Sequence, residues 1–87
     1  MNEKQLLNRV NQIFKEILEI EELSLNGKDQ IIDIDGWDSL NHVKIILGIE
    51  SEFNIRLKAS EIFDIEIIDE LIEAIKLNIM LISLMLV

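Results

Sequence analysis

The stretch Asp35-Gly36-Trp37-Asp38-Ser39-Leu40 joins a polar segment of the chain to a periodic apolar segment. Asp38 or Ser39 is suited to cap the first turn of a helix that the apolar period predicts over residues 39–53. The backbone N–H groups and the dipole at a helix start favour an anion there. A phosphate ester on Ser39 would therefore be well placed. Helix capping alone is an equally simple explanation for the same residues.

The segments on both sides of this junction predict an all-α fold. A helix is expected over about residues 3–20, a long polar-punctuated loop over 21–38, and a short helical turn over 60–63. The face of a last helix is formed by Ile68, Leu71, Ile72, Ile75 and Ile79. The chain lacks proline, has three glycines and is 49% hydrophobic, which suits a helical bundle. We therefore predict a four-helix bundle with a long first loop and a short third helix.

Composition narrows the classes of function. The 87 residues suffice for one domain with a modest core. The absence of cysteine excludes disulfides, thiolate metal sites and cysteine nucleophiles, and is consistent with a reducing compartment. We expect a cytoplasmic protein, because the N-terminus does not resemble a signal peptide. The net charge of -9 makes nucleic acid an improbable partner.

The predicted helix over residues 39–53 has more apolar residues than one buried face requires. At 100° per residue they fall into two stripes, of which one should be core and the other a docking surface. One stripe holds Ile45, Ile46, Ile49 and Phe53, and the other, which adjoins Ser39, holds Leu40, Val43 and Leu47.

The chain resembles the acyl carrier protein family over about residues 2–78, through Asp38-Ser39-Leu40, through Phe53-Asn54-Ile55 and through the helix spacing. The resemblance implies a carrier, not an enzyme. Ser39 would receive a covalent 4'-phosphopantetheine arm from coenzyme A, attached by a separate magnesium-dependent transferase, and the thiol of the arm would hold cargo as a thioester. Asp38, with Asp35 as a second candidate, would lie close enough to help hold the transferase's magnesium.

The resemblance also implies partners. These are a phosphopantetheinyl transferase, a cargo-loading ligase or synthetase, and a downstream acyltransferase. The family uses the helix after the serine for recognition, so we expect Leu40, Val43 and Leu47 to be the exposed, partner-binding stripe. Asn41 and Lys44 stand where Asp and Glu are common in fatty-acid carriers, which puts docking to fatty-acid synthase enzymes in doubt. Acyl and aminoacyl cargo both remain open.

The same residues allow three other interpretations. Placing Gly36 at the glycine position of a calcium-binding EF-hand loop puts Ile31 and His42 where acidic ligands are required, so a calcium site is not expected. Ser39 and His42 could form a hydrolytic pair, but no oxyanion-hole motif accompanies them. A carrier-like adaptor that is never modified, and acts only by binding proteins, is the main alternative. Trp37 could pack the loop onto the bundle or touch partners, and packing is favoured.

The last nine residues, 79–87, are almost uniformly apolar, and we predict them to extend the last helix beyond a carrier domain of residues 1–78. A helix of this length is too short to span a bilayer, so no transmembrane span is expected. The segment could pack along its own bundle, self-associate, or dock on a partner or membrane surface. Self-association is favoured, because an all-round apolar helix cannot be buried against one side of a small bundle.

Overall fold

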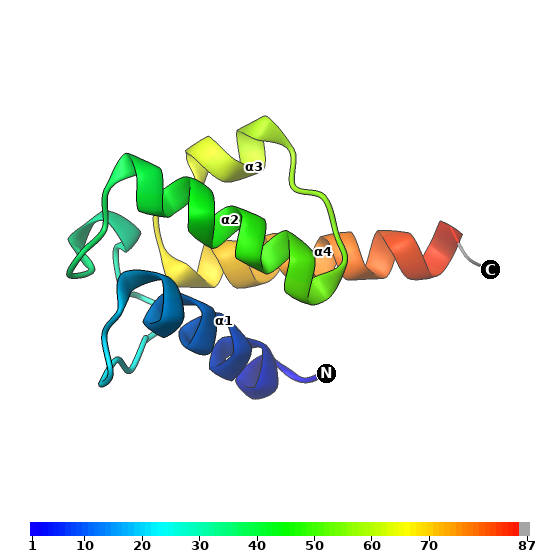
Figure 1. The fold of residues 1–87 in the computed structure, drawn as a ribbon. Helices are drawn as coiled ribbons and strands as arrows, with labels where there is room; N and C mark the ends of the chain where they lie inside the picture. Colours follow the sequence, from blue (N-terminus) through cyan, green and yellow to red (C-terminus); the bar gives the residue numbers. More distant parts are fainter. Residues whose placement is uncertain (86–87) are drawn as a thin grey trace.

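The computed structural model describes residues 1–85, and in them it confirms the all-α architecture (Figure 1). The one β-type pairing of the described chain is an isolated antiparallel bridge between Gln30 and Ile67. The elements, in chain order, are α1 (Glu3–Leu18), the 3-10 helix η1 (Ile31–Asp33), α2 (Ser39–Phe53), α3 (Ala59–Asp64) and α4 (Ile68–Met85).

Helix α1 begins and ends at identifiable caps. The Asn2 side chain accepts a hydrogen bond from the Gln5 backbone N–H, and the Gln5 side chain accepts one from the Asn2 N–H, each at 2.9 Å. The helix ends at Leu18, slightly before the predicted residue 20, because Glu19 adopts a left-handed backbone with φ of 56°. The Glu19 N–H bonds the Lys15 carbonyl, which closes the last turn.

The core lies where one face of α1 meets α2 and α4. Gly48 lets α1 and α2 approach closely, since a Cβ at this position would lie only 3.1 Å from the Ile13 side chain. The fully buried side chains come from all three helices: Leu6, Val10, Phe14, Ile45, Ile49, Ile68, Leu71 and Ile75. These helices therefore form the rigid frame on which the remaining segments are held.

The loop between α1 and α2 is anchored rather than loose. Its Leu25 and Ile31 side chains are buried in the core. Asn11 of α1 donates from its side-chain amide to the Leu23 carbonyl at 2.8 Å and accepts from the Leu25 N–H at 2.7 Å. Farther along, the Ile31 N–H donates to the Glu66 carbonyl at 2.9 Å, which ties the loop to the start of α4. The approach to α2 is thus fixed at several points.

Helix α4 continues beyond the rest of the molecule (Figure 1). With this helix included, the described molecule measures 41 × 25 × 21 Å along its principal axes. Ile79 is half-buried against the core, but every residue from Met80 to Met85 is exposed. Packing along its own bundle, one of the three arrangements considered for this segment, is therefore not observed over residues 80–85. Leu86 and Val87 lie outside the described residues. Among residues 1–85, no helix has the length and apolarity needed to cross a membrane.

Candidate functional site

The loop-to-α2 junction places Ser39 at the first residue of a helix. Gly36 has a φ of 84°, a left-handed conformation that glycine adopts without strain, and it turns the loop toward α2. Asp38 is the N-cap: its backbone is extended, and its Oδ1 accepts the Asn41 N–H at 2.7 Å. Ser39 itself is exposed. The hydroxyl is consequently held at the N-terminal end of the helix dipole and is open to a large partner.

Asn41 has a structural role that sequence reasoning missed. Its side-chain amide donates to the Gly36 carbonyl at 2.9 Å, while its backbone N–H is bound by Asp38. A carboxylate at this position could not donate that bond at neutral pH. The departure from the acidic residue common in fatty-acid carriers therefore has a local explanation, since Asn41 closes the turn that presents Ser39.

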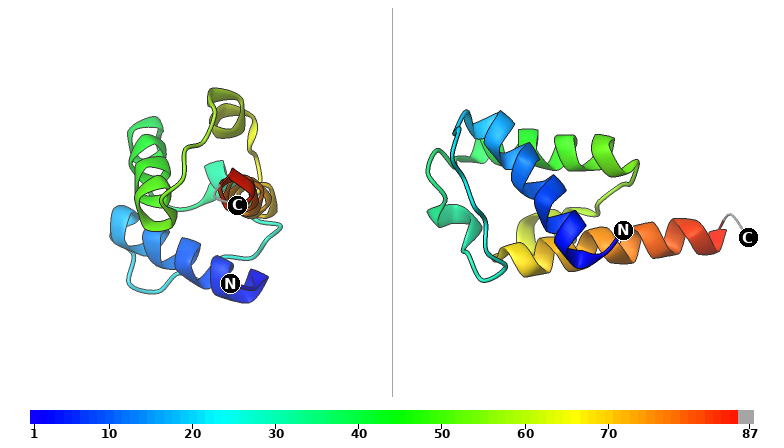
Figure 2. Two further views of the ribbon diagram at one scale, coloured as in Figure 1. Left: turned by 90° about the vertical axis from the view of Figure 1, so that its right-hand side faces the viewer. Right: turned by 90° about the horizontal axis from the view of Figure 1, so that it is seen from below.

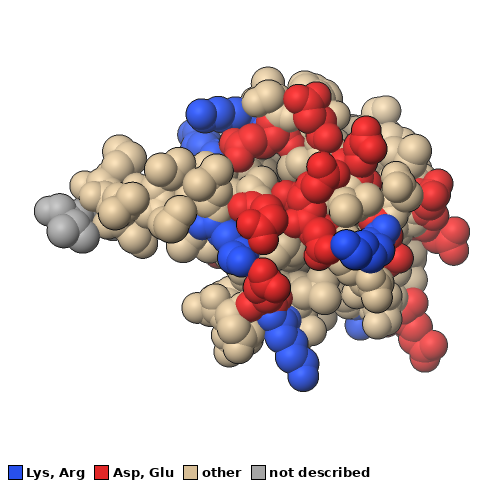
Figure 3. All heavy atoms as spheres, turned by 180° about the vertical axis from the view of Figure 1, so that it is seen from behind, with Lys and Arg blue, Asp and Glu red and all other residues tan. Residues whose placement is uncertain are grey.

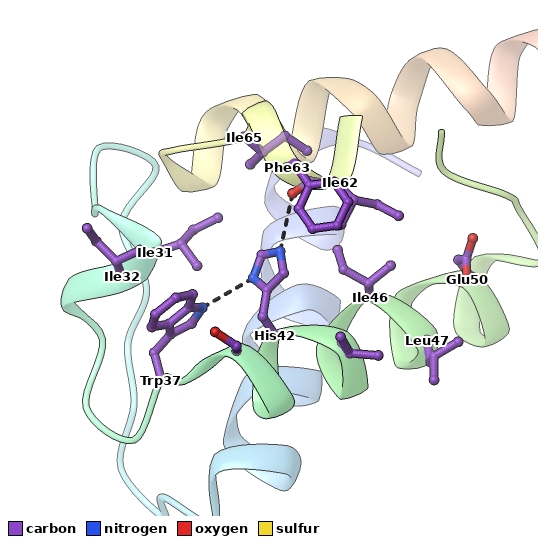
Figure 4. Close-up of a pocket in the computed structure, with 12 residues that line it drawn as sticks. Ile31, Ile32, Trp37, His42, Ile46, Leu47, Glu50, Ile62, Phe63 and Ile65 are labelled. Carbon is purple, nitrogen blue, oxygen red and sulfur yellow. Dashed lines mark hydrogen bonds between the residues drawn. The ribbon is translucent and has the colours of Figure 1, made fainter. Parts of the chain in front are cut away.

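His42 links three elements beside Ser39 (Figure 4). Its Nδ1 accepts the indole N–H of Trp37 at 3.2 Å, and its Nε2 lies 3.2 Å from the Ile62 carbonyl of α3. Because an indole nitrogen only donates, Nδ1 must be the acceptor and Nε2 must hold the proton. Both ring nitrogens are therefore engaged, and neither is left to activate Ser39. This geometry argues against the hydrolytic pair considered from sequence.

Trp37 is half-buried, and its ring meets the His42 ring edge to face, with centroids 5.9 Å apart. It packs against the core cluster, which confirms the expected packing role. Trp37 thus forms a wall between η1 and α2, next to the serine.

An apolar groove opens beside Ser39, between α2 and α3 (Figure 4). Its volume is about 520 Å³, within the range of small-molecule sites in proteins. Ser39 is one of its lining residues, and so is the buried Ile46. The remaining lining residues are Ile31, Ile32, Trp37, His42, Val43, Leu47, Glu50, Ile62, Phe63 and Ile65. The sequence did not predict this groove, because it depends on contacts between α2 and α3.

The two stripes of α2 face opposite environments. Ile45, Ile46 and Ile49 are buried, and Phe53 is half-buried. The other stripe is exposed as predicted: Leu40 is 65% exposed, Val43 53% and Leu47 59%. Val43 and Leu47 also line the groove, so the same side chains border the cavity and the outer surface. Their role in partner binding stays a prediction.

Two acidic residues lie close to Ser39 along the chain. Asp35 and Asp38 both lie on the surface of the junction. From behind, Asp and Glu side chains cover much of the body (Figure 3). Within residues 1–85, no group of three or more His, Cys, Asp or Glu side chains is arranged to hold a metal ion.

Known proteins were compared with this chain. Residues 8–75 match the family model described as "Phosphopantetheine attachment site". The fold is similar to the solution NMR structure of holo acyl carrier protein from Geobacter metallireducens, with a TM-score of 0.76 and 23% identity over 84% of each chain. The structural similarity supports the four-helix fold, and the family match covers the loop, Ser39 and the groove.

Proposed function

Because the chain belongs to the phosphopantetheine-attachment family of carrier proteins, we propose that it transports an acyl group as a thioester on an arm joined to Ser39. The family establishes the covalent 4'-phosphopantetheine and a carrier role without catalysis. The attachment residue and the acyl cargo are our proposals. The observation that supports both is the position of Ser39, exposed at the start of α2 and at the edge of an apolar groove.

The residues at the junction suit the arm. Asp38 caps the helix and Asn41 holds the turn, so the Ser39 hydroxyl is presented without strain in the chain. The N-terminal end of α2 stabilises the negative charge of a phosphate ester. The bound arm supplies the thiol, which this cysteine-free chain cannot supply itself.

The groove favours an apolar acyl chain over an aminoacyl group. Its walls are mainly aliphatic and aromatic side chains, and a free ammonium group would lose its hydration there. Glu50, half-buried, is the carboxylate that borders the groove. Both His42 ring nitrogens already have hydrogen-bond partners in Trp37 and Ile62. An acyl chain can therefore contact the imidazole without leaving a nitrogen unpaired. An apolar acyl cargo is consistent with a carrier for fatty acids, specialised lipids or polysaccharide modification.

Arm attachment is tested by mass spectrometry of the purified chain after incubation with coenzyme A, magnesium and a broad-specificity phosphopantetheinyl transferase. We expect a gain of one phosphopantetheine, mapped to Ser39 by proteolysis. Ser39→Ala should abolish the gain, whereas Ser51→Ala, a matched change of an exposed serine in α2, should leave it intact. A wild-type chain that gains no mass would favour the unmodified adaptor. A gain that persists in Ser39→Ala would refute the site.

The cargo class is tested separately by NMR on chains loaded with acetyl, octanoyl or alanyl arms. We expect the octanoyl form to shift the signals of Ile46 and Ile62 relative to the acetyl form, and the alanyl form to leave them unchanged. If the octanoyl and acetyl spectra agreed at these residues, the groove would not hold the cargo.

A further inference from the structure

The C-terminal part of helix α4 projects from the body (Figure 1). Lys76 bonds Glu3 of α1 at 2.7 Å, and Asn78 bonds Glu61 of α3 at 3.0 Å, so the helix is held up to this turn. The residues from Met80 to Met85 leave the bundle, as the right-hand view of Figure 2 shows. This projecting part is helical in the structure even though nothing in the body covers it.

The projecting part has an apolar stripe on the side opposite the core. The stripe, here called the tail stripe, has members spaced by three, four, seven and eight residues, as on one helical face. It consists of Leu77, Met80, Leu81, Leu84 and Met85. All five side chains are exposed, with Leu84 at 68% and Met85 at 84%. Leu77 to Met85 includes no charged residue, so this is an extended apolar surface of a kind that usually marks an interaction site.

Charge separates the partners that could cover the tail stripe. Helices that lie on membranes usually present Lys and Arg on their polar face, and none lies between Leu77 and Met85. Seen from behind, the acidic side chains gather on the body, while the outer part of α4 is free of charged residues (Figure 3). Two chains with a net charge of -9 each can approach most easily through this uncharged projection. A second copy therefore fits the stripe better than an anionic membrane.

We propose that the tail stripe pairs with the tail stripe of a second copy in an antiparallel arrangement. Leu77 then lies opposite Leu84 of the other copy, and Met80 opposite Leu81, in a self-complementary twofold contact. A parallel pair would bring two acidic bodies side by side, whereas the antiparallel pair places them at opposite ends. The overlap is about 13 Å long at 1.5 Å per residue. Such a contact belongs with interfaces below about 1,200 Å² in total, which are weak and depend on concentration.

The oligomeric state is tested by sedimentation of the full chain over a wide range of concentration. We expect the mass of one chain when dilute and of two chains when concentrated. Leu81→Asp should keep the chain monomeric throughout, and Ser83→Asp, which adds the same charge on another side of α4, should preserve the dimer. Circular dichroism should show that both variants remain helical. A wild-type chain that stays monomeric when concentrated overturns the proposal, as does binding of the monomer to phosphatidylcholine vesicles.

The direction of pairing is tested by cysteine cross-linking in a Ser39→Ala background, which has no arm thiol, and the chain has no cysteine of its own. A mixture of Leu77→Cys and Leu84→Cys chains should form a mixed disulfide dimer rapidly on mild oxidation. Leu77→Cys alone should cross-link at least tenfold more slowly. Rapid cross-linking of Leu77→Cys alone would indicate a parallel pair and overturn the antiparallel arrangement. Arm attachment at Ser39 is measured separately by mass spectrometry, so failure of the pairing proposal can be told apart from failure of the proposed carrier function.

Discussion

Helices α2 and α4 both have an apolar stripe that their own bundle does not bury, and they differ in what surrounds it. The α2 stripe lies beside Ser39 and borders a groove whose far wall is α3. The tail stripe of α4 lies beyond the body, where no element of residues 1–85 covers it. We propose that these two exposed apolar stripes serve different purposes. The position of each stripe relative to Ser39 would determine whether it acts with the arm or independently of it.

The sharpest test of this comparison concerns the two sides of α2. Ile49 is fully buried, so Ile49→Ala should lower the free energy of unfolding by about 2–5 kcal/mol. Leu47→Ala on the exposed stripe should change it by no more than about 0.5 kcal/mol. Urea denaturation of both variants measures the difference. Equal losses would mean that the exposed stripe is part of the core and that the comparison with α4 fails.

The second prediction concerns partner binding by the α2 stripe. Leu47→Glu should lower kcat/KM for arm attachment by a phosphopantetheinyl transferase about tenfold, or about 1.4 kcal/mol, because the carboxylate must be desolvated in the complex. Thermal unfolding should stay close to that of the wild type. Gln12→Glu adds the same charge to an exposed site on α1 and serves as the control.

The same substitution on α4 separates the two stripes. Leu84→Glu is expected to weaken self-association and to leave arm attachment near the wild-type rate. If Leu84→Glu slowed attachment as much as Leu47→Glu did, the two stripes would contribute to one common surface.

The third prediction separates the two roles of Asp38, at the start of α2. Asp38→Ala removes the N-cap and should lower the free energy of unfolding by about 1 kcal/mol. Asp38→Asn keeps a good cap and should retain most of that stability, while it removes the carboxylate. A slower attachment rate in Asp38→Asn, measured at saturating magnesium and again at limiting magnesium, would support a contact with the transferase's ion. An unchanged rate would leave Asp38 as a cap alone.

The smallest effect is expected at the base of the α4 projection, where Lys76 bonds Glu3. The hydrogen bond to Lys76 and its positive charge lower the pKa of the Glu3 carboxyl. The bond to Glu3 raises the pKa of Lys76. Because the carboxyl pKa is lower in the folded chain, Glu3 stabilises the fold at pH values above its unfolded-state pKa, and this stabilisation is lost as the pH falls through its folded-state pKa. Because the lysine pKa is higher in the folded chain, Lys76 stabilises the fold at pH values below its unfolded-state pKa, and this stabilisation is lost as the pH rises through its folded-state pKa.

The pair therefore contributes most near neutral pH, and only weakly, because both groups are exposed and screened by salt. Glu3→Gln should lower the urea midpoint slightly at neutral pH and low salt, and not at acid pH. Glu16→Gln, an equal charge change on α1, is the control. A Glu3→Gln effect that persisted at acid pH would have another cause.

Local periodicity predicted much of this structure because it reflects burial directly. The bounds of α2 follow from Asp38 as a cap and Asn54 in a left-handed conformation, both recognisable residue types. The exposure of Leu40 and Leu47 followed from the 100° rotation per residue together with the resemblance to known carriers. Helical spacing was therefore sufficient to predict the helix that positions the site.

Local periodicity could not predict contacts between residues that are far apart in the sequence. The 3-10 helix η1 forms where Ile31 is buried and where its N–H bonds Glu66, far along the chain. The His42 bond to Ile62 crosses 20 residues. The groove exists because these bonds position the loop and α3 against α2, and no periodicity in one segment encodes that. Asn41 could have been recognised, since an amide can donate to the turn before it and a carboxylate cannot.

The bond between Trp37 and His42 has a practical consequence for following this protein in solution. Trp37 is the only tryptophan of the chain, and tyrosine is absent. Its indole lies on the wall of the groove that begins at Ser39, and its N–H donates to a single imidazole nitrogen. Indole emission responds to hydration and to neighbouring hydrogen-bond partners. The chain therefore contains its own fluorescent reporter, through which the arrival of the arm and the entry of cargo could be followed in real time without any added label.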